Sequence, residues 1–167
     1  MAETVQQYVR RILGNVKGRD PLRTQQATPR RLARLIRGRR RSQLTRRPGR
    51  GKWSVAEILA HLAEAEMVGG YRMRMILSAN GTPIQAFDQD VWARVSSYGR
   101  QDPKHSLELF TALRRSNLAL LRSLKPRQWR MYGMHSERGK ETVARLATMF
   151  AGHDINHTRQ IEKILHR

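Results

Sequence analysis

Apolar residues recur three and four positions apart over four long stretches of the chain, and this spacing constrains the fold more than any other feature. It places the apolar side chains on one face of an α-helix. The stretches cover residues 4–16, 54–78, 103–124 and 141–165. Helices of this kind bury their apolar faces against one another, so the pattern predicts an all-α fold, a four-helix bundle.

A short additional helix is predicted in the N-terminal part of the chain. Thr28 can cap it, Pro29 fits its first turn, and the apolar residues that follow would form its inner face. The next segment, residues 38–51, reads as a mobile basic connection. We therefore expect a single domain over residues 1–167, with residues 30–52 as a basic connecting segment.

The helix of residues 54–78 has the clearest start signal in the chain. In WSVAE, Ser54 stands three residues before Glu57, which is the spacing of a capping box. The connection that follows, residues 80–102, is long enough to return along the bundle, because about 20 extended residues exceed the roughly 36 Å of a 24-residue helix. The two flanking helices are therefore expected to run parallel. No strand pair is predicted.

The chain is strongly basic, with 33 Lys and Arg against 13 Asp and Glu. Of the 21 residues from Arg30 to Arg50, ten are arginine. Such a segment can bind phosphates, but it contains no aromatic side chain that could stack on bases. We expect weak, non-specific nucleic-acid binding at most.

The composition also bears on the compartment. No stretch approaches the roughly 18 apolar residues of a membrane-spanning helix, and the N-terminus lacks the apolar run of a signal peptide. There is no cysteine, hence no disulfide, no thiolate ligand and no thiol nucleophile of the chain's own. We expect a cytoplasmic protein without membrane association.

Two histidines four residues apart, His153 and His157, lie in the last stretch. At about 100° per residue, with Val143 at zero, they fall near about 280° and 320°, within the apolar stripe. A single inward histidine is ordinarily a hydrogen-bonded core residue, whereas an inward pair at this spacing can present two imidazoles to one metal ion. The spacing leaves both interpretations open, and a metal site needs a third ligand.

Four other histidines could supply that ligand. His166 lies at the end of the chain, His105 in the first turn of a helix, and His135 in a predicted loop. The remaining residue, His61, lies on the shoulder of the apolar face of its helix. From there it could point between the helices or be half exposed.

Three motifs resemble those of the DinB/YfiT-like superfamily: GKWSVAEILAHLAEAE (51–66), GHDINHTRQI (152–161) and FDQDVWA (87–93). They occur in the order found there, and the resemblance extends over about residues 5–165. It implies a four-helix bundle, often a homodimer, with one metal-binding histidine from the second helix and two from the last. On this chain, the ligand set implied is His61, His153 and His157.

Three imidazoles leave a coordination position open, as in catalytic zinc sites. Zinc or nickel is expected, and iron or manganese is compatible with these ligands. Characterised members of the superfamily include thiol-dependent S-transferases, so the resemblance implies a metal-dependent S-transferase or hydrolase for a small-molecule substrate, with a low-molecular-weight thiol as a further cofactor. Asp88 and Asp90, in the long connection, are the candidate catalytic carboxylates, and turn capping is their alternative role.

Two other interpretations remain. A metal-stabilised bundle could act as a binding module that docks nucleic acid or an acidic partner through residues 30–50. A purely structural bundle would hold no ion. Binding through phosphates would weaken steeply with salt, whereas a small-molecule enzyme would not depend on salt in this way.

Overall fold

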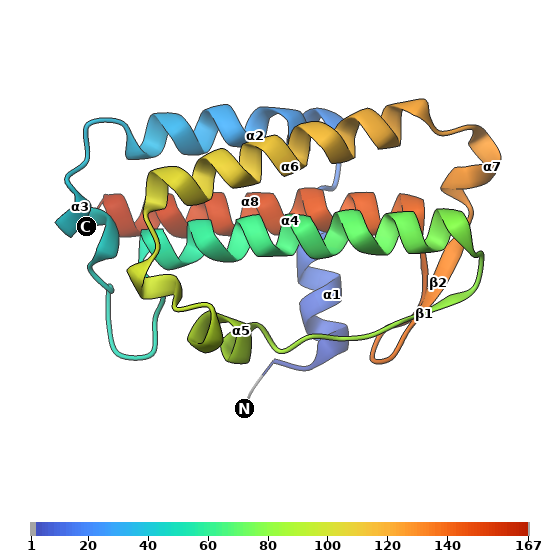
Figure 1. Ribbon diagram of the computed structural model, residues 1–167, viewed down its shortest axis with the longest axis horizontal. Helices are drawn as coiled ribbons and strands as arrows, with labels where there is room; N and C mark the ends of the chain where they lie inside the picture. The colour runs from blue at the N-terminus through green and yellow to red at the C-terminus, as the bar shows by residue number, and fades with distance from the viewer. Residues whose placement is uncertain (1–2, 167) are drawn as a thin grey trace.

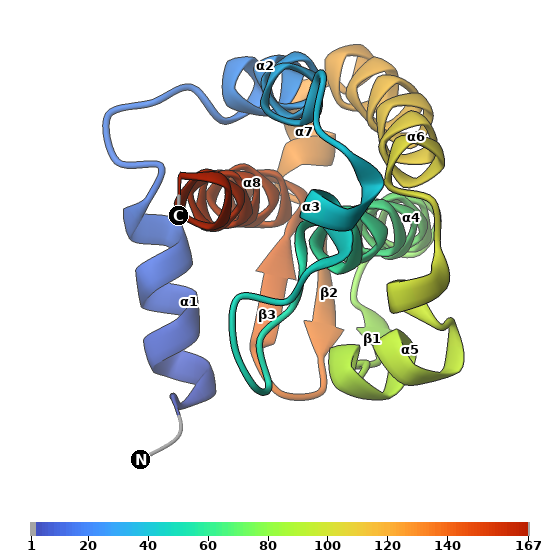
Figure 2. The same cartoon turned by 90° about the vertical axis from the view of Figure 1, so that its left-hand side faces the viewer.

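The computed structural model describes residues 3–166, and four long helices dominate it (Figure 1). They are α2 (Pro21–Ile36), α4 (Val55–Ser78), α6 (Pro103–Ser123) and α8 (Val143–Leu165). In Figures 1 and 2, α4 and α6 lie side by side and run in the same direction, while α2 and α8 run in the opposite direction. The predicted four-helix bundle is confirmed, and so is the parallel course of the two helices that flank residues 80–102.

The bundle is held together by apolar side chains from all four helices. α4 is buried on most sides, and its N-terminus has the predicted capping box: the Ser54 hydroxyl accepts from the Glu57 backbone N–H, and the Glu57 carboxylate accepts from the Ser54 backbone N–H at 2.8 Å. The largest apolar cluster includes Leu32, Ile58, Leu62, Phe110 and Ile161.

Residues 80–102 return along the outside of the bundle, below α4 in Figure 1. They contain a strand, a helix and a 3-10 turn, namely β1 (Thr82–Ile84), α5 (Gln89–Val95) and η1 (Tyr98–Arg100). Tyr98 is fully buried and donates its hydroxyl to Glu64 at 2.6 Å. This contact fixes the far end of the connection on α4.

A small sheet lies at one end of the bundle, which the sequence did not predict. β1 pairs in parallel with β2 (Tyr132–His135), and β2 pairs antiparallel with β3 (Gly139–Thr142). Between α6 and the sheet lies the short helix α7 (Pro126–Trp129). Strands of three or four residues are too short to display a period-two pattern, and the β1–β2 pairing joins segments about 50 residues apart.

The helix predicted to begin at Thr28 begins at Pro21, where Asp20 caps it by accepting from the Arg23 backbone N–H at 2.9 Å. Pro29 therefore lies inside α2 and not in its first turn. A proline at this position cannot donate to the carbonyl of Gln25, four residues earlier. The Arg114 guanidinium donates to that carbonyl at 2.9 Å, so a residue of α6 supplies the missing hydrogen bond.

The basic connecting segment is also more ordered than predicted. Residues 30–36 belong to α2, and residues 41–45 form α3 (Arg41–Thr45). Leu44 is 2% exposed and packs in the largest apolar cluster, which anchors the segment to the bundle. Residues 41–45 are therefore not part of an irregular connection, contrary to the prediction for residues 38–51.

The prediction that residues 4–16 form one of the four bundle helices was wrong: α1 (Val5–Gly14) packs across α8 (Figure 2), and α2 takes its place in the bundle. Its capping box is formed by Thr4 and Gln7. The contact is very close at Gly152 of α8, where a Cβ atom would lie 2.1 Å from the Ile12 carbonyl oxygen. In the described residues, no helix is both long and apolar enough to cross a membrane.

Gly152→Ala is expected to destabilise the protein by about 1–3 kcal/mol, because the backbone of α1 must move away from α8. Gly14→Ala is the matched control, since nothing lies within 4 Å of its added Cβ. Urea unfolding of the two variants measures the difference. Equal stabilities would contradict the close approach of α1 to α8.

Candidate metal centre and its cavity

Three histidine side chains meet inside the bundle between α4 and α8. The Nε2 atom of His153 lies 3.0 Å from Nε2 of His61 and 3.1 Å from Nε2 of His157. One nitrogen of each ring is within 4.8 Å of the others. The structure thus brings together the three histidines of the predicted ligand set, and His61 points between the helices.

All three rings are held in the neutral form at neutral pH. Burial, followed by the charge of His157, lowers the pKa of His61 well below its ordinary value. Burial and the two neighbouring histidines likewise lower the pKa of His153. For His157, burial lowers the pKa to about 4, although a hydrogen bond with Gln160 raises it. Neutral imidazoles are the form that binds metal ions.

Two contacts orient the rings. Nδ1 of His157 lies 3.0 Å from the Gln160 side-chain oxygen, which fits an N–H donor at Nδ1 and leaves the Nε2 lone pair directed at the cluster. Trp53 packs against the His61 ring at 4.9 Å between ring centroids. Nδ1 of His61 is buried and has no hydrogen-bond partner in the part of the chain that the structure describes.

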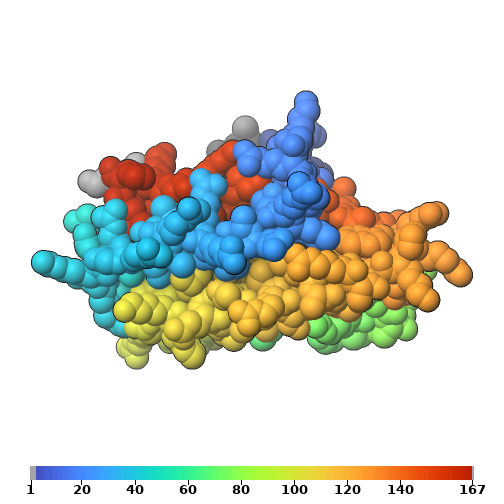
Figure 3. All heavy atoms as spheres, turned by 90° about the horizontal axis from the view of Figure 1, so that it is seen from above, coloured from blue at the N-terminus to red at the C-terminus, as the bar shows by residue number. Residues whose placement is uncertain are grey.

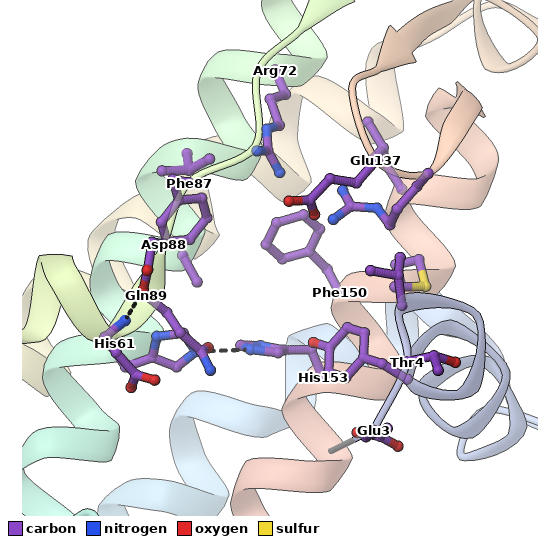
Figure 4. Close-up of a pocket in the computed structure, with 18 residues that line it drawn as sticks. Glu3, Thr4, His61, Arg72, Phe87, Asp88, Gln89, Glu137, Phe150 and His153 are labelled. Atoms are coloured by element: carbon purple, nitrogen blue, oxygen red, sulfur yellow. Dashed lines mark hydrogen bonds between the residues drawn. The ribbon is translucent and has the colours of Figure 1, made fainter. Parts of the chain in front are cut away.

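A cavity of about 430 Å³ opens next to the cluster (Figure 4). His61 and His153 form one end of it, whereas His157 does not line it. The side chains of α4 and α8 form two walls, and the first residues of α1, residues 87–90 and the β2–β3 turn close the others. The cavity thus depends on segments that are distant in the sequence.

Asp88 and Asp90 both line this cavity, as a catalytic role would require. Asp88 also caps α5: its carboxylate accepts from the backbone N–H groups of Asp90 and Val91 at 2.8 and 3.0 Å. These hydrogen bonds lower the pKa of Asp88. The carboxylate of Asp90 accepts no hydrogen bond within residues 3–166. Asp88 therefore caps a helix, which was the alternative to a catalytic role. Asp90 has no capping role.

The other histidines lie outside the cluster. His105 is exposed in the first turn of α6, and His166 caps the end of α8. His135 was predicted to lie in a loop, but it lies in β2, where it is 3% exposed.

Two groups of polar residues near the site were not predicted. Arg72 lines the cavity at the end opposite the histidines, and its spacing from His61 on α4 could have revealed it. The second group is an ion cluster in the bundle core, in which Arg114 pairs with Glu66 and Asp154. No pattern in the sequence indicates that these three side chains meet.

The buried histidines make acid destabilisation an expected property of the metal-free protein. The pKa of His157 is about 4 in the folded chain against 6.5 ordinarily, so the unfolded chain binds more protons between these pH values. The free energy of unfolding should therefore be fully retained above pH 6.5 and fall as the pH drops towards 4, by roughly 3 kcal/mol for this residue. Urea unfolding in EDTA at several pH values tests this. A pH slope that is the same in His157→Gln would contradict it.

Fold and site together define a class of protein: a four-helix bundle whose second and last bundle helices bring three histidines to one end of a cavity. A family model described as the DinB superfamily matches residues 24–161, and the chain belongs to that superfamily.

Individual relatives agree with this assignment. A Bacillus subtilis protein, "Putative metal-dependent hydrolase YfiT", is 27% identical over 119 residues, which cover 70% of this chain and 66% of YfiT. A "Putative metal-dependent hydrolase" of Oceanobacillus iheyensis is 26% identical over 117 residues, 70% of this chain and 67% of that protein. The solved YfiT structure, described as "a probable metal-dependent hydrolase with an unusual four-helix bundle topology", matches with a TM-score of 0.81 at 23% identity, over 86% of this chain and 83% of that chain. That likeness confirms the fold.

Proposed function

We propose that this protein is a metal-dependent enzyme that acts on a small molecule, with His61, His153 and His157 as the ligands of one divalent ion. The observation that supports this most directly is the convergence of three neutral imidazoles beside a cavity. The relatives named as metal-dependent hydrolases make hydrolysis the first choice of reaction. Transfer of a low-molecular-weight thiol to an electrophile is the second.

The three residues fit such an ion. Two nitrogens bound to one zinc ion at tetrahedral angles would be about 3.3 Å apart, given Zn–N distances of about 2.0–2.1 Å. The two Nε2–Nε2 distances of 3.0 and 3.1 Å are close to this value. Without an ion, the Nε2 atom of His153 would have to form hydrogen bonds with the Nε2 atoms of both His61 and His157. A neutral ring nitrogen offers either one proton or one lone pair, so it can form only one of them.

Zinc is proposed first, with nickel, iron and manganese as alternatives, because imidazole binds all four. When bound, such an ion polarises a carbonyl or lowers the pKa of a coordinated water or thiol towards neutrality. Since His61 and His153 face the cavity, a substrate there can reach the ion on its open side. Phe87 and Phe150 in the cavity wall would exclude water from the rest of the substrate.

For proton transfer, Asp90 is the better candidate of the two predicted carboxylates. It lines the cavity, and its carboxylate is not engaged in capping a helix. Asp88 accepts two backbone hydrogen bonds that favour its charged form, which makes it a weak base. Asp88 would instead hold residues 88–90 in place at the mouth of the cavity.

The test is a comparison of metal-loaded and EDTA-treated protein against activated esters and amides, with and without added thiols. Hydrolysis that requires the metal and no thiol supports a hydrolase, whereas a requirement for thiol supports a transferase. Asp90→Asn is expected to lower kcat by about 100-fold or more, as the loss of a general base does. Metal-loaded protein without activity towards any substrate in either series would contradict both reactions.

A second candidate function follows from the arginine-rich segment. Of its ten arginines, Arg31, Arg41 and Arg47 pair with carboxylates, and the other seven are exposed without an ion pair in the described residues. α2, which bears several of them, lies beside α6 over the face seen in Figure 3. We propose weak, non-specific binding of nucleic acid or an acidic partner here, as a separate property from the cavity.

If this second proposal holds, affinity for a random DNA duplex should fall by tenfold or more between about 50 and 200 mM salt. Replacing Arg34 and Arg37 together with glutamine should weaken binding, because both side chains are exposed on α2 and at its end. His153→Ala should leave it unchanged. Affinity that does not depend on salt would contradict a phosphate-based mode.

A further inference from the structure

One stripe of α4 follows the cavity from end to end. Its residues are spaced four, three and four apart, so they project from the same side of the helix: His61, Ala65, Val68 and Arg72. At 1.5 Å per residue, the first and last are about 16 Å apart along the helix axis. Figure 4 shows Arg72 at the opposite end from His61 and His153, with Phe87 and Phe150 between them. The cavity is therefore elongated, with imidazoles at one end, a guanidinium at the other and apolar side chains in the middle.

Arg72 is a buried cation without an ion pair in the described residues. It is 7% exposed, donates one hydrogen bond to the Gln85 carbonyl at 2.7 Å, and its guanidinium lies 5.6 Å from the centre of the Phe87 ring. Burial, followed by the charge of Arg138, lowers its pKa to about 10, so it stays charged at neutral pH. Burying a charge without a partner is costly.

The other buried arginine in residues 3–166 has carboxylate partners. Arg114, 1% exposed, binds both Glu66 and Asp154. Glu141 pairs with Arg138 through two hydrogen bonds of 2.8 and 2.9 Å. Glu137 also lines the cavity but makes no ion pair with Arg72. A guanidinium has five N–H donors arranged for a carboxylate or phosphate, and Arg72 donates only one hydrogen bond to residues 3–166.

We propose that Arg72 binds an anionic group, a carboxylate or a phosphate, on the small molecule that occupies the cavity. The substrate class is then an elongated molecule with its reactive group at the histidine end, an apolar middle and an anion at the far end. The position of the reactive group rests on the proposed function. The anion site itself does not require the metal.

The test uses EDTA-treated protein, so that a carboxylate or phosphate cannot bind an ion at the histidines. Hexanoate, hexyl phosphate and uncharged hexanamide are titrated separately, and NMR follows the methyl groups of Val68 and Met149, which line the cavity. Wild-type protein should bind one of the anions at least tenfold more tightly than hexanamide. The anion that binds more tightly identifies the group as carboxylate or phosphate.

Variants assign the preference to the guanidinium. Arg72→Gln should lose tenfold or more in affinity for the anion while binding hexanamide as before. Arg72→Lys, which keeps the charge but not the fork, should bind the anion with intermediate affinity. Arg74→Gln is the matched control, because it removes the same charge from the same helix. The Arg74 side chain is exposed and does not line the cavity.

The inference is wrong if hexanamide binds as tightly as the anions, if neither anion shifts the Val68 and Met149 methyl signals, or if Arg72→Gln and Arg74→Gln behave alike. The wild-type comparison of anion and amide needs no variant, so a poorly folded variant does not prevent a decision. Because no turnover is measured, an anion site in an inactive protein would disprove the proposed function alone. Activity without anion preference would disprove this inference alone.

Discussion

His153→Ala is expected to remove the bound metal almost completely, from near one ion per chain to below about one tenth. Nε2 of His153 lies within 3.1 Å of Nε2 of both other histidines, so its loss leaves only two imidazole ligands, one on α4 and one on α8. Two imidazoles do not hold an ion firmly. Mass spectrometry on protein made without a histidine tag or nickel column measures the metal content.

The same change should lower the melting temperature in the presence of metal. An ion present at about 1,000 times its dissociation constant stabilises the folded state by about 4 kcal/mol, which corresponds to about 8–16 °C for a chain of this size. EDTA should reduce the difference between wild type and variant. His105→Ala is the control, since that side chain is exposed at the start of α6. Metal retained in His153→Ala would disprove this ligand set.

Arg114→Met is expected to destabilise the protein by about 3–5 kcal/mol, the cost of breaking a buried ion pair by removing one partner. Arg114 donates to Glu66 at 2.8 Å and to Asp154 at 2.9 Å, and all three side chains are at most 3% exposed. Its loss leaves two buried carboxylates without their cation and the Gln25 carbonyl without the Arg114 donor, while Asn117 still donates to Glu66 at 2.9 Å. Burial already raises the pKa of Asp154, so this carboxyl should take up a proton in the variant.

Arg115→Met provides a close control, because this substitution removes the same charge from a neighbouring arginine that is exposed. Urea unfolding at neutral pH compares the two variants. At a temperature where it is folded, Arg114→Met should still bind metal, because Arg114 is not a ligand. A loss of stability no larger than that of Arg115→Met would contradict the role of the ion cluster in the core.

The helices were predictable because their signals are local. The capping box of Ser54 and Glu57, the apolar spacing of α4 and α8, and the placement of His153 and His157 on the inner face all depend on residues within one or two turns. The length of residues 80–102 was enough to predict that α4 and α6 run parallel. The position of His61 was open from spacing alone, and the resemblance to a known superfamily resolved it.

The errors came from interactions between distant segments. Pro29 was predicted to lie at the start of a helix, because a proline inside a helix leaves a carbonyl without a hydrogen-bond donor and is therefore unfavourable. Here Arg114 of α6 supplies that donor. The sheet was missed because β1 is paired with a strand about 50 residues later. Leu44 anchors a segment whose many arginines suggested a mobile connection.

The sequence by itself therefore determined three of the four long helices, their inner faces, the inward histidine pair and, through the superfamily motifs, the third histidine. Only the tertiary structure decided which polar groups meet: the three Nε2 atoms, the Arg114 ion cluster, and the cavity that places Arg72 opposite His61. The physical reason is range. Helix periodicity and capping are set by neighbours along the chain, whereas a site is formed by side chains from several elements, and their distances exist only once those elements have packed.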